Sequence, residues 1–88
     1  MKLKYEFVVN NVAGETVAVS VGNTAGAFNG YIKLNDTGAF IFNALKDDAT
    51  REEIINKLMA EYPDASQEDA TESVDELINK LNEAELLV

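Results

Sequence analysis

Apolar and polar residues alternate with a period of two in two segments near the start of the chain, residues 4–10 and residues 15–21. Both segments are rich in β-branched or aromatic side chains, so we predict two strands, each with one buried face. The turn residues of the intervening NNVAG stretch predict a hairpin. The residues expected on the buried faces are Tyr5, Phe7, Val9, Val17, Val19 and Val21.

A third alternating segment, residues 28–34, predicts a third strand that points Tyr31 and Lys33 outward. Gly30, in its middle, marks a bulge or a close approach of another backbone. Strands that pair in sequence order leave the first and third at the edges of the sheet. The residues expected to face inward are Phe28, Ile32 and Leu34.

Beyond Leu34 the apolar residues recur every three to four positions, which predicts helices. Asn35 or Asp36 can cap the first helix, and Pro63 ends the second. The predicted capping boxes pair Thr50 with Glu53 and Ser66 with Asp69. The residues expected to be buried are Phe40, Ile41, Ala44 and Leu45 in the first helix, and Ala70, Val74, Leu77, Ile78 and Leu81 in the longest one.

The order of elements predicts an α+β fold with a three-stranded antiparallel β-meander followed by three helices. This order is also winged-helix-like. At 88 residues the chain is long enough for one modest core, so we expect a single domain over residues 1–88.

The formal charge of -9 is unevenly distributed. Residues 1–46 carry four lysines and three carboxylates, so residues 47–88 hold the whole acidic excess. Such a surface repels phosphate backbones and anionic lipid, and we expect neither a nucleic-acid nor a membrane partner. The longest helix, with Lys80 among many carboxylates, is unsuited to a major groove. No apolar run is long enough for a signal peptide or a membrane span, which favours a cytoplasmic protein.

The composition argues against catalysis. The chain has no Cys and no His, so the usual general base, thiolate nucleophile and commonest metal ligands are missing. The acidic run of residues 66–78 has the caps of a continuous helix rather than the glycine-centred loop of a calcium site. We therefore predict a protein that is not an enzyme, with no catalytic residues, no metal site and no cofactor.

The open edge of the third strand is the strongest candidate for function, since another chain can pair with its free backbone groups. If the longest helix packs beside this edge, the two form a groove, although most of the helix's apolar residues also fill the core. The expected apolar wall is Val74, Leu77, Ile78 and Leu81, and the expected acidic rim is Glu72, Asp75 and Glu76. An acidic rim would speed the encounter with a basic peptide.

Residues 32–62 followed by residues 68–88 resemble the PqqD family, named for a pyrroloquinoline quinone (PQQ) biosynthesis protein. The resemblance covers residues 28–88 and rests on a strand ending in Leu-Asn, a small-residue step and a Leu-rich end of the third helix. The positions that carry it are Thr50, Glu53 and Ile54 in the second helix, and Val74, Ile78, Leu81 and Leu86 in the third helix and beyond.

The resemblance implies a recognition element for precursor peptides of ribosomally made natural products. Such a chaperone captures the leader segment as a strand and presents it to a modifying enzyme, often a radical S-adenosylmethionine (SAM) enzyme, in PQQ or related biosynthesis. Carried onto this sequence, the peptide-binding residues are Gly30, Tyr31, Ile32 and Lys33 on the strand, with Val74, Leu77, Ile78 and Leu81 on the helix.

Two other functions remain open. The exposed edge can pair with its own copy, which would make the chain a homodimeric structural or interaction domain. The winged-helix-like order also allows an acidic regulator, which would show itself as retention on DNA at low salt.

Overall fold

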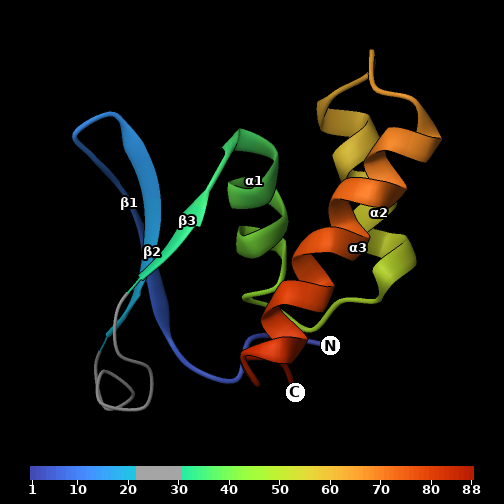
Figure 1. Ribbon diagram of the computed structural model, residues 1–88. Coiled ribbons are helices and arrows are strands. Elements are labelled where there is room, and N and C mark those ends of the chain that lie inside the picture. Colours follow the sequence, from blue (N-terminus) through green and yellow to red (C-terminus); the bar gives the residue numbers. More distant parts are fainter. Residues whose placement is uncertain (22–30) are drawn as a thin grey trace.

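A computed structural model describes residues 1–21 and 31–88 (Figure 1). Three strands are followed by three helices, which confirms the predicted α+β fold. The predicted inward residue Phe28 and the predicted site residue Gly30 lie outside the described residues. The elements are β1 (Phe7–Val12), β2 (Glu15–Ser20), β3 (Tyr31–Leu34), α1 (Asp36–Ala44), α2 (Arg51–Glu61) and α3 (Gln67–Glu83).

The β1–β2 hairpin turns through two residues, which is tighter than the predicted five-residue stretch. Val12 pairs directly with Glu15. Ala13 and Gly14 both have positive φ, 54° and 84°. A two-residue turn with both central residues in the left-handed region is type I′, whose twist matches that of the flanking strands. β1 therefore continues through Asn10 and Asn11, which were predicted to lie in the turn.

The sheet is antiparallel with the order β1-β2-β3, so β1 and β3 are its edges. Val9, Ala18 and Ile32 lie in one cross-strand row, and all three belong to the core or pack against it. The predicted helix-facing side of β2 is therefore wrong, because Val17 and Val19 lie on the opposite face, although Val17 is buried there as predicted, 8% exposed. Ala18 faces the helices because β1 and β3 place Phe7, Ile32 and Leu34 on its side of the sheet.

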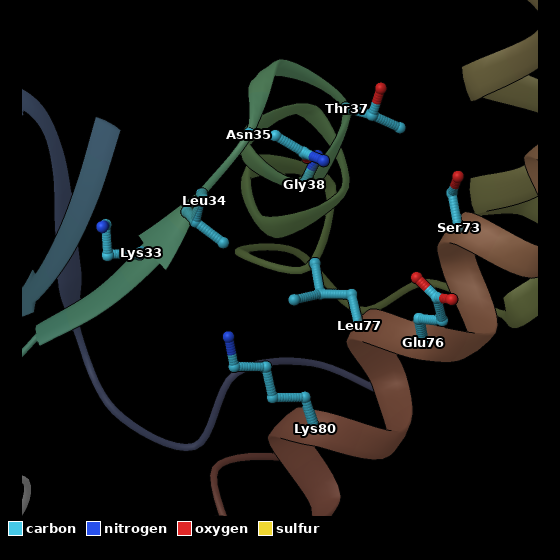
Figure 2. A pocket seen from close by; sticks show the side chains of 9 residues that line it. All are labelled: Lys33, Leu34, Asn35, Thr37, Gly38, Ser73, Glu76, Leu77 and Lys80. Carbon is cyan, nitrogen blue, oxygen red and sulfur yellow. The ribbon is translucent and has the colours of Figure 1, made fainter. Parts of the chain in front are cut away.

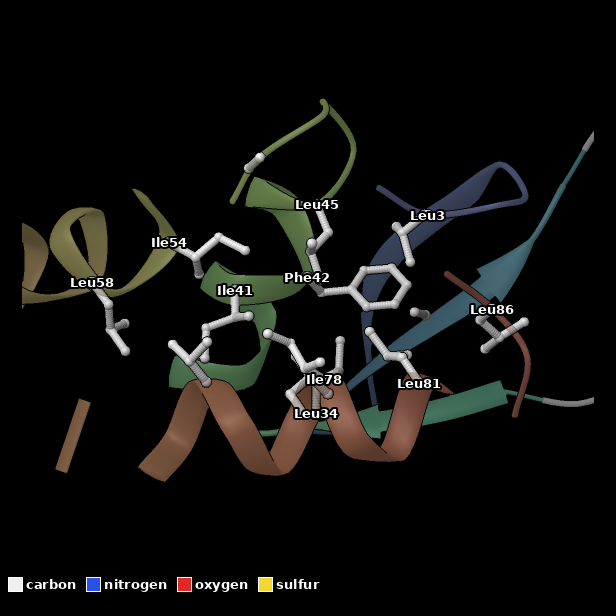
Figure 3. Close-up of a cluster of buried hydrophobic side chains, with 14 of the residues drawn as sticks. Leu3, Leu34, Ile41, Phe42, Leu45, Ile54, Leu58, Ile78, Leu81 and Leu86 are labelled. Atoms are coloured by element: carbon white, nitrogen blue, oxygen red, sulfur yellow. The ribbon is translucent and has the colours of Figure 1, made fainter. Parts of the chain in front are cut away.

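The core is formed by the inner face of the sheet and by all three helices, with α1 next to β3 and α2 packed on α1 and α3 (Figure 3). Phe42 of α1 is fully buried, and its ring lies edge-on to that of Phe7, 5.3 Å between centroids. The predicted inner face of α1 is corrected at this point: Phe42 takes the central place, whereas the half-buried Phe40 packs edge-on against Tyr62. Because α1 is nearly surrounded, its buried face is wider than the predicted stripe.

Side-chain caps begin all three helices. Asn35 caps α1, and the predicted capping box of Thr50 and Glu53 is present at α2. At α3 the Ser66 hydroxyl accepts a hydrogen bond from the Asp69 backbone N–H. Residues 2–4 pair with residues 86–88, and this pairing holds Leu86 in the core, where it is 1% exposed.

Among residues 1–21 and 31–88, no helix combines the length and apolar character that crossing a bilayer requires.

Candidate functional site: the open edge of β3

The hydrogen-bond ladder between β1 and β2 determines where each backbone group of β2 points. The Val21 N–H donates to the Glu6 carbonyl over 3.0 Å, one step beyond the first paired residues of β1 and β2. Hydrogen-bonded pairs alternate along an antiparallel ladder. The odd-numbered residues of β2 therefore bond to β1, and its even-numbered residues bond to β3.

The same alternation fixes the outward groups of β3. Ile32 and Leu34 stand opposite Ala18 and Thr16, so their backbone groups bond to β2. The N–H and C=O groups of Tyr31 and Lys33 consequently point away from the sheet, toward a side where the described residues place no further strand. We call this row of backbone groups the open edge.

A pocket of about 220 Å³ lies beside the open edge, where β3, the start of α1 and the side of α3 meet (Figure 2). Leu34 and Leu77 point into it from opposite walls. We call it the β3–α3 pocket. Its lining residues are Lys33, Leu34, Asn35, Thr37, Gly38, Ser73, Glu76, Leu77 and Lys80.

The sharp change from strand to helix creates one wall of this pocket. The Asn35 side chain accepts a hydrogen bond from the Gly38 N–H over 2.7 Å, which closes the first turn of α1 immediately after β3 ends. A Cβ at Gly38 would lie 3.0 Å from Asn35 Oδ1, so a residue without a side chain suits this turn. The cap thus holds the start of the helix against the end of the strand.

The structure brings some of the predicted site residues together and separates others. Lys33 and Leu77 line the same pocket, although they are far apart in the sequence. Val74 and Leu81 are 0% and 1% exposed inside the core, and Ile78 is 9% exposed. On α3, the predicted apolar wall is thus mainly core, and Leu77 alone of the four lines the pocket.

Comparison with known proteins places the chain in a family. The model of the family described as "Coenzyme PQQ synthesis protein D (PqqD)" matches residues 6–87. The chain belongs to the PqqD family. The fold is similar to that of a chain solved as "TbiB1 in Complex with the TbiA(beta) Leader Peptide", with a TM-score of 0.69 and 24% identity over 99% of this chain and 94% of that chain. No curated protein matches the chain.

Sequence reasoning about this PqqD-family chain missed the polar part of the pocket. Ser73, Leu77 and Lys80 recur at intervals of three to four residues, so they share one side of α3. That spacing is visible in the sequence, but the prediction grouped Leu77 with the apolar residues Val74, Ile78 and Leu81 and not with Ser73 and Lys80. Thr37 was not distinguishable from any other residue in the first turn of a helix.

The two lysines of the pocket differ in their partners. Lys33 Nζ lies 3.0 Å from Glu15 Oε1, and the hydrogen bond and charge of Glu15 raise the pKa of Lys33. For Lys80, no carboxylate of the described residues lies within ion-pair distance of Nζ. Figure 2 shows its ammonium pointing toward β3, away from the Glu76 carboxylate. The β3–α3 pocket therefore contains one cation, Lys80, that has no counterion among the described residues.

The expected acidic rim is only partly at the pocket. Glu76 lines it, whereas Asp75 binds Arg51 of α2 through two hydrogen bonds of 2.6 and 2.8 Å. Glu72 and Asp75 line a separate shallow hollow on α3. Of the three expected rim residues, Glu76 alone lines the β3–α3 pocket. Among the described residues, no group of three or more Asp or Glu side chains is arranged to hold a metal ion.

Proposed function

We propose that this chain is a non-catalytic binding protein that captures the leader segment of a ribosomally made precursor peptide. The observation that carries the proposal is the open edge of β3 beside the β3–α3 pocket. Membership of the PqqD family supports it, and so does the likeness to a fold solved with a leader peptide. We also propose that the chain presents the bound segment to a modifying enzyme, for example a radical SAM enzyme.

In this mechanism the leader adds to the sheet as a fourth strand. Its backbone exchanges hydrogen bonds with the N–H and C=O groups of Tyr31 and Lys33, which supplies affinity without regard to sequence. Alternate side chains of a strand point to opposite faces. Every second leader residue therefore faces the helices and enters the pocket between Leu34 and Leu77, which supplies selectivity.

The chemistry of the chain supports binding rather than catalysis as its role. The sequence has neither Cys nor His, and the pocket's titratable groups are two lysines and Glu76. None of these groups has an obvious nucleophile or base partner at the pocket. A recognition element needs only backbone pairing and shape, both of which the edge and the pocket provide.

An amide chemical-shift titration tests the proposal, with leader peptides encoded next to the gene for this chain as probes. Shifts should concentrate on residues 31–34 and on Ser73, Leu77 and Lys80. Lys33→Pro removes the outward N–H and should raise the Kd obtained from the shifts about tenfold, whereas Lys33→Thr keeps that N–H and should leave the Kd nearly unchanged. An unchanged Kd in a folded Lys33→Pro variant would exclude strand addition at this edge.

A second candidate is self-association through the same edge. The observation that favours it is the exposed outer face of the sheet, where Tyr31 of β3 and Val8 of β1 are 59% and 39% exposed. A homodimer of this kind would dissociate on dilution and would compete with peptide. Light scattering across a range of protein concentrations distinguishes it from a monomer that binds peptide.

A further inference from the structure

We infer that the strand bound at the open edge places an acidic side chain in the β3–α3 pocket, two positions from an apolar one. This inference rests on the proposed function and adds to it the chemistry of the peptide. Residues two apart on a strand face the same side. Two leader side chains that both point at the helices therefore enter the pocket together.

The size of the pocket suits side chains rather than a cofactor. Its volume of about 220 Å³ is below the roughly 300–1,000 Å³ of typical small-molecule sites. Leu34 and Leu77 are only 9% and 7% exposed, so the part they offer is a small apolar floor. An aliphatic side chain covers such a floor, and the remaining lining is polar.

The polar lining consists mostly of hydrogen-bond donors. Lys80 carries a charge that no carboxylate among the described residues neutralises, and its ammonium points toward β3. The Asn35 oxygen is occupied by the Gly38 N–H, which leaves its amide hydrogens to donate. The hydroxyls of Thr37 and Ser73 can donate or accept, and Figure 2 shows both pointing away from the Lys80 ammonium. The group that favours a carboxylate on the peptide is therefore the Lys80 ammonium.

The net charge of the chain does not reverse this preference. Exposed charges separated by more than about 8–10 Å are largely screened at physiological salt. The remaining local acid is Glu76, which Figure 2 shows pointing away from the Lys80 ammonium. Lys33 is held by Glu15, so Lys80 is the residue that selects the charge of the peptide. We therefore no longer expect the peptide to be basic where it meets the pocket.

Lys80 also lies in the last turn of α3, where a cation stabilises the helix regardless of any ligand. A test must therefore measure which peptide side chains the pocket prefers, and not only the stability of the protein. The chain offers a matched control in Lys57, an exposed lysine of α2 outside the pocket. Lys80→Glu and Lys57→Glu change the net charge equally and differ only in place.

The experiment selects displayed, randomised short peptides on the unchanged chain and on both variants. The unchanged chain and Lys57→Glu should enrich Asp or Glu two positions from an aliphatic residue, and Lys80→Glu should enrich Lys or Arg at that position. For one selected acidic peptide, Lys80→Gln should raise Kd about 2- to 5-fold, as expected for a partly exposed ion pair.

The outcomes separate the two proposals. If binding of the selected peptides depends on the open edge (weakened about tenfold by Lys33→Pro, kept with Lys33→Thr) but their charge preference is unchanged by Lys80→Glu, this inference is overturned and the proposed function stands. If no peptide is selected, or if none depends on the edge, the proposed function fails and the inference fails with it.

Discussion

The two edge strands of the sheet have the same kind of backbone and different surroundings. The hydrogen-bond alternation points every second residue outward on β1 as on β3. Figure 1 shows the β1–β2 hairpin projecting away from the helices, whereas β3 leads directly into α1. The end of β3 also shares the β3–α3 pocket with α3. A different pocket lies at the start of β1, and its lining includes residues 2–6 together with Phe7 and Val8.

The difference between the two edges indicates that an open edge alone does not make a selective site. An added strand at β1 would gain backbone hydrogen bonds but would have no helix beside it to read its side chains. At β3 the same hydrogen bonds stand next to Leu34, Leu77 and Lys80. Under the proposed function, the edge supplies the affinity for the peptide, and the side chains of α3 supply the selectivity.

The largest expected effect is on stability, when a buried leucine of α3 is truncated. Leu77→Ala and Leu81→Ala both truncate leucines of α3 that are less than a tenth exposed, 7% and 1%. Each should lower the free energy of unfolding by about 2–5 kcal/mol, Leu77→Ala at the lower end because it lies at the pocket. Urea denaturation measures this.

Peptide affinity should separate these two variants. Leu77→Ala removes part of the apolar floor, so leader binding should weaken, whereas Leu81→Ala leaves the pocket lining unchanged. Equal loss of binding in two folded variants would mean that stability, rather than the wall, determines recognition.

The second effect compares the edges directly. Asn11 of β1 and Lys33 of β3 both direct their N–H outward, so proline at either position removes no hydrogen bond of the ladder. Both variants should remain folded by circular dichroism. Lys33→Pro should raise the Kd for a leader peptide about tenfold through a lost hydrogen bond and a steric clash.

Asn11→Pro should leave that Kd unchanged, because the proposed binding uses the β3 edge. A rise in Kd with Asn11→Pro, and none with Lys33→Pro, would move the binding site to β1.

The sequence predicts more of the fold than of the site, and the reason is physical. Element order and caps are local properties, so Thr50 with Glu53 could be assigned from spacing alone. The inner face of β2 depends on its neighbours, because Ala18 and Val17 are equally compatible with an alternating strand. Phe42 was missed because a nearly surrounded helix buries more than one stripe.

The site adds information that no local pattern contains. Which N–H of β3 points outward depends on the register of β1 against β2, two strands away. The pocket also joins Lys33 to Lys80 through packing of α3 beside β3. An open third strand and Leu77 could be proposed from the sequence, whereas the unpaired charge of Lys80 required the fold.

The smallest expected effect concerns the ion pair that joins α3 to α2. Arg51 of α2 holds Asp75 of α3 through two hydrogen bonds, and this contact lowers the pKa of Asp75 below its ordinary value of 3.8. A carboxyl whose pKa is lower in the folded state stabilises the fold above its unfolded pKa. That stabilisation is lost as the pH falls through the folded pKa.

Asp75→Asn should therefore lower the melting temperature slightly at neutral pH, and its difference from the unchanged chain should shrink as the pH falls below about 4. Asp64→Asn removes the same charge from an exposed residue of the α2–α3 connection and serves as the control. A difference for Asp75→Asn that stays constant down to pH values near 2 would show that the carboxylate is not what stabilises α2 against α3. In that case the position of the wall would depend on the apolar packing of α3 alone, and peptide binding at the β3 edge should be insensitive to both substitutions.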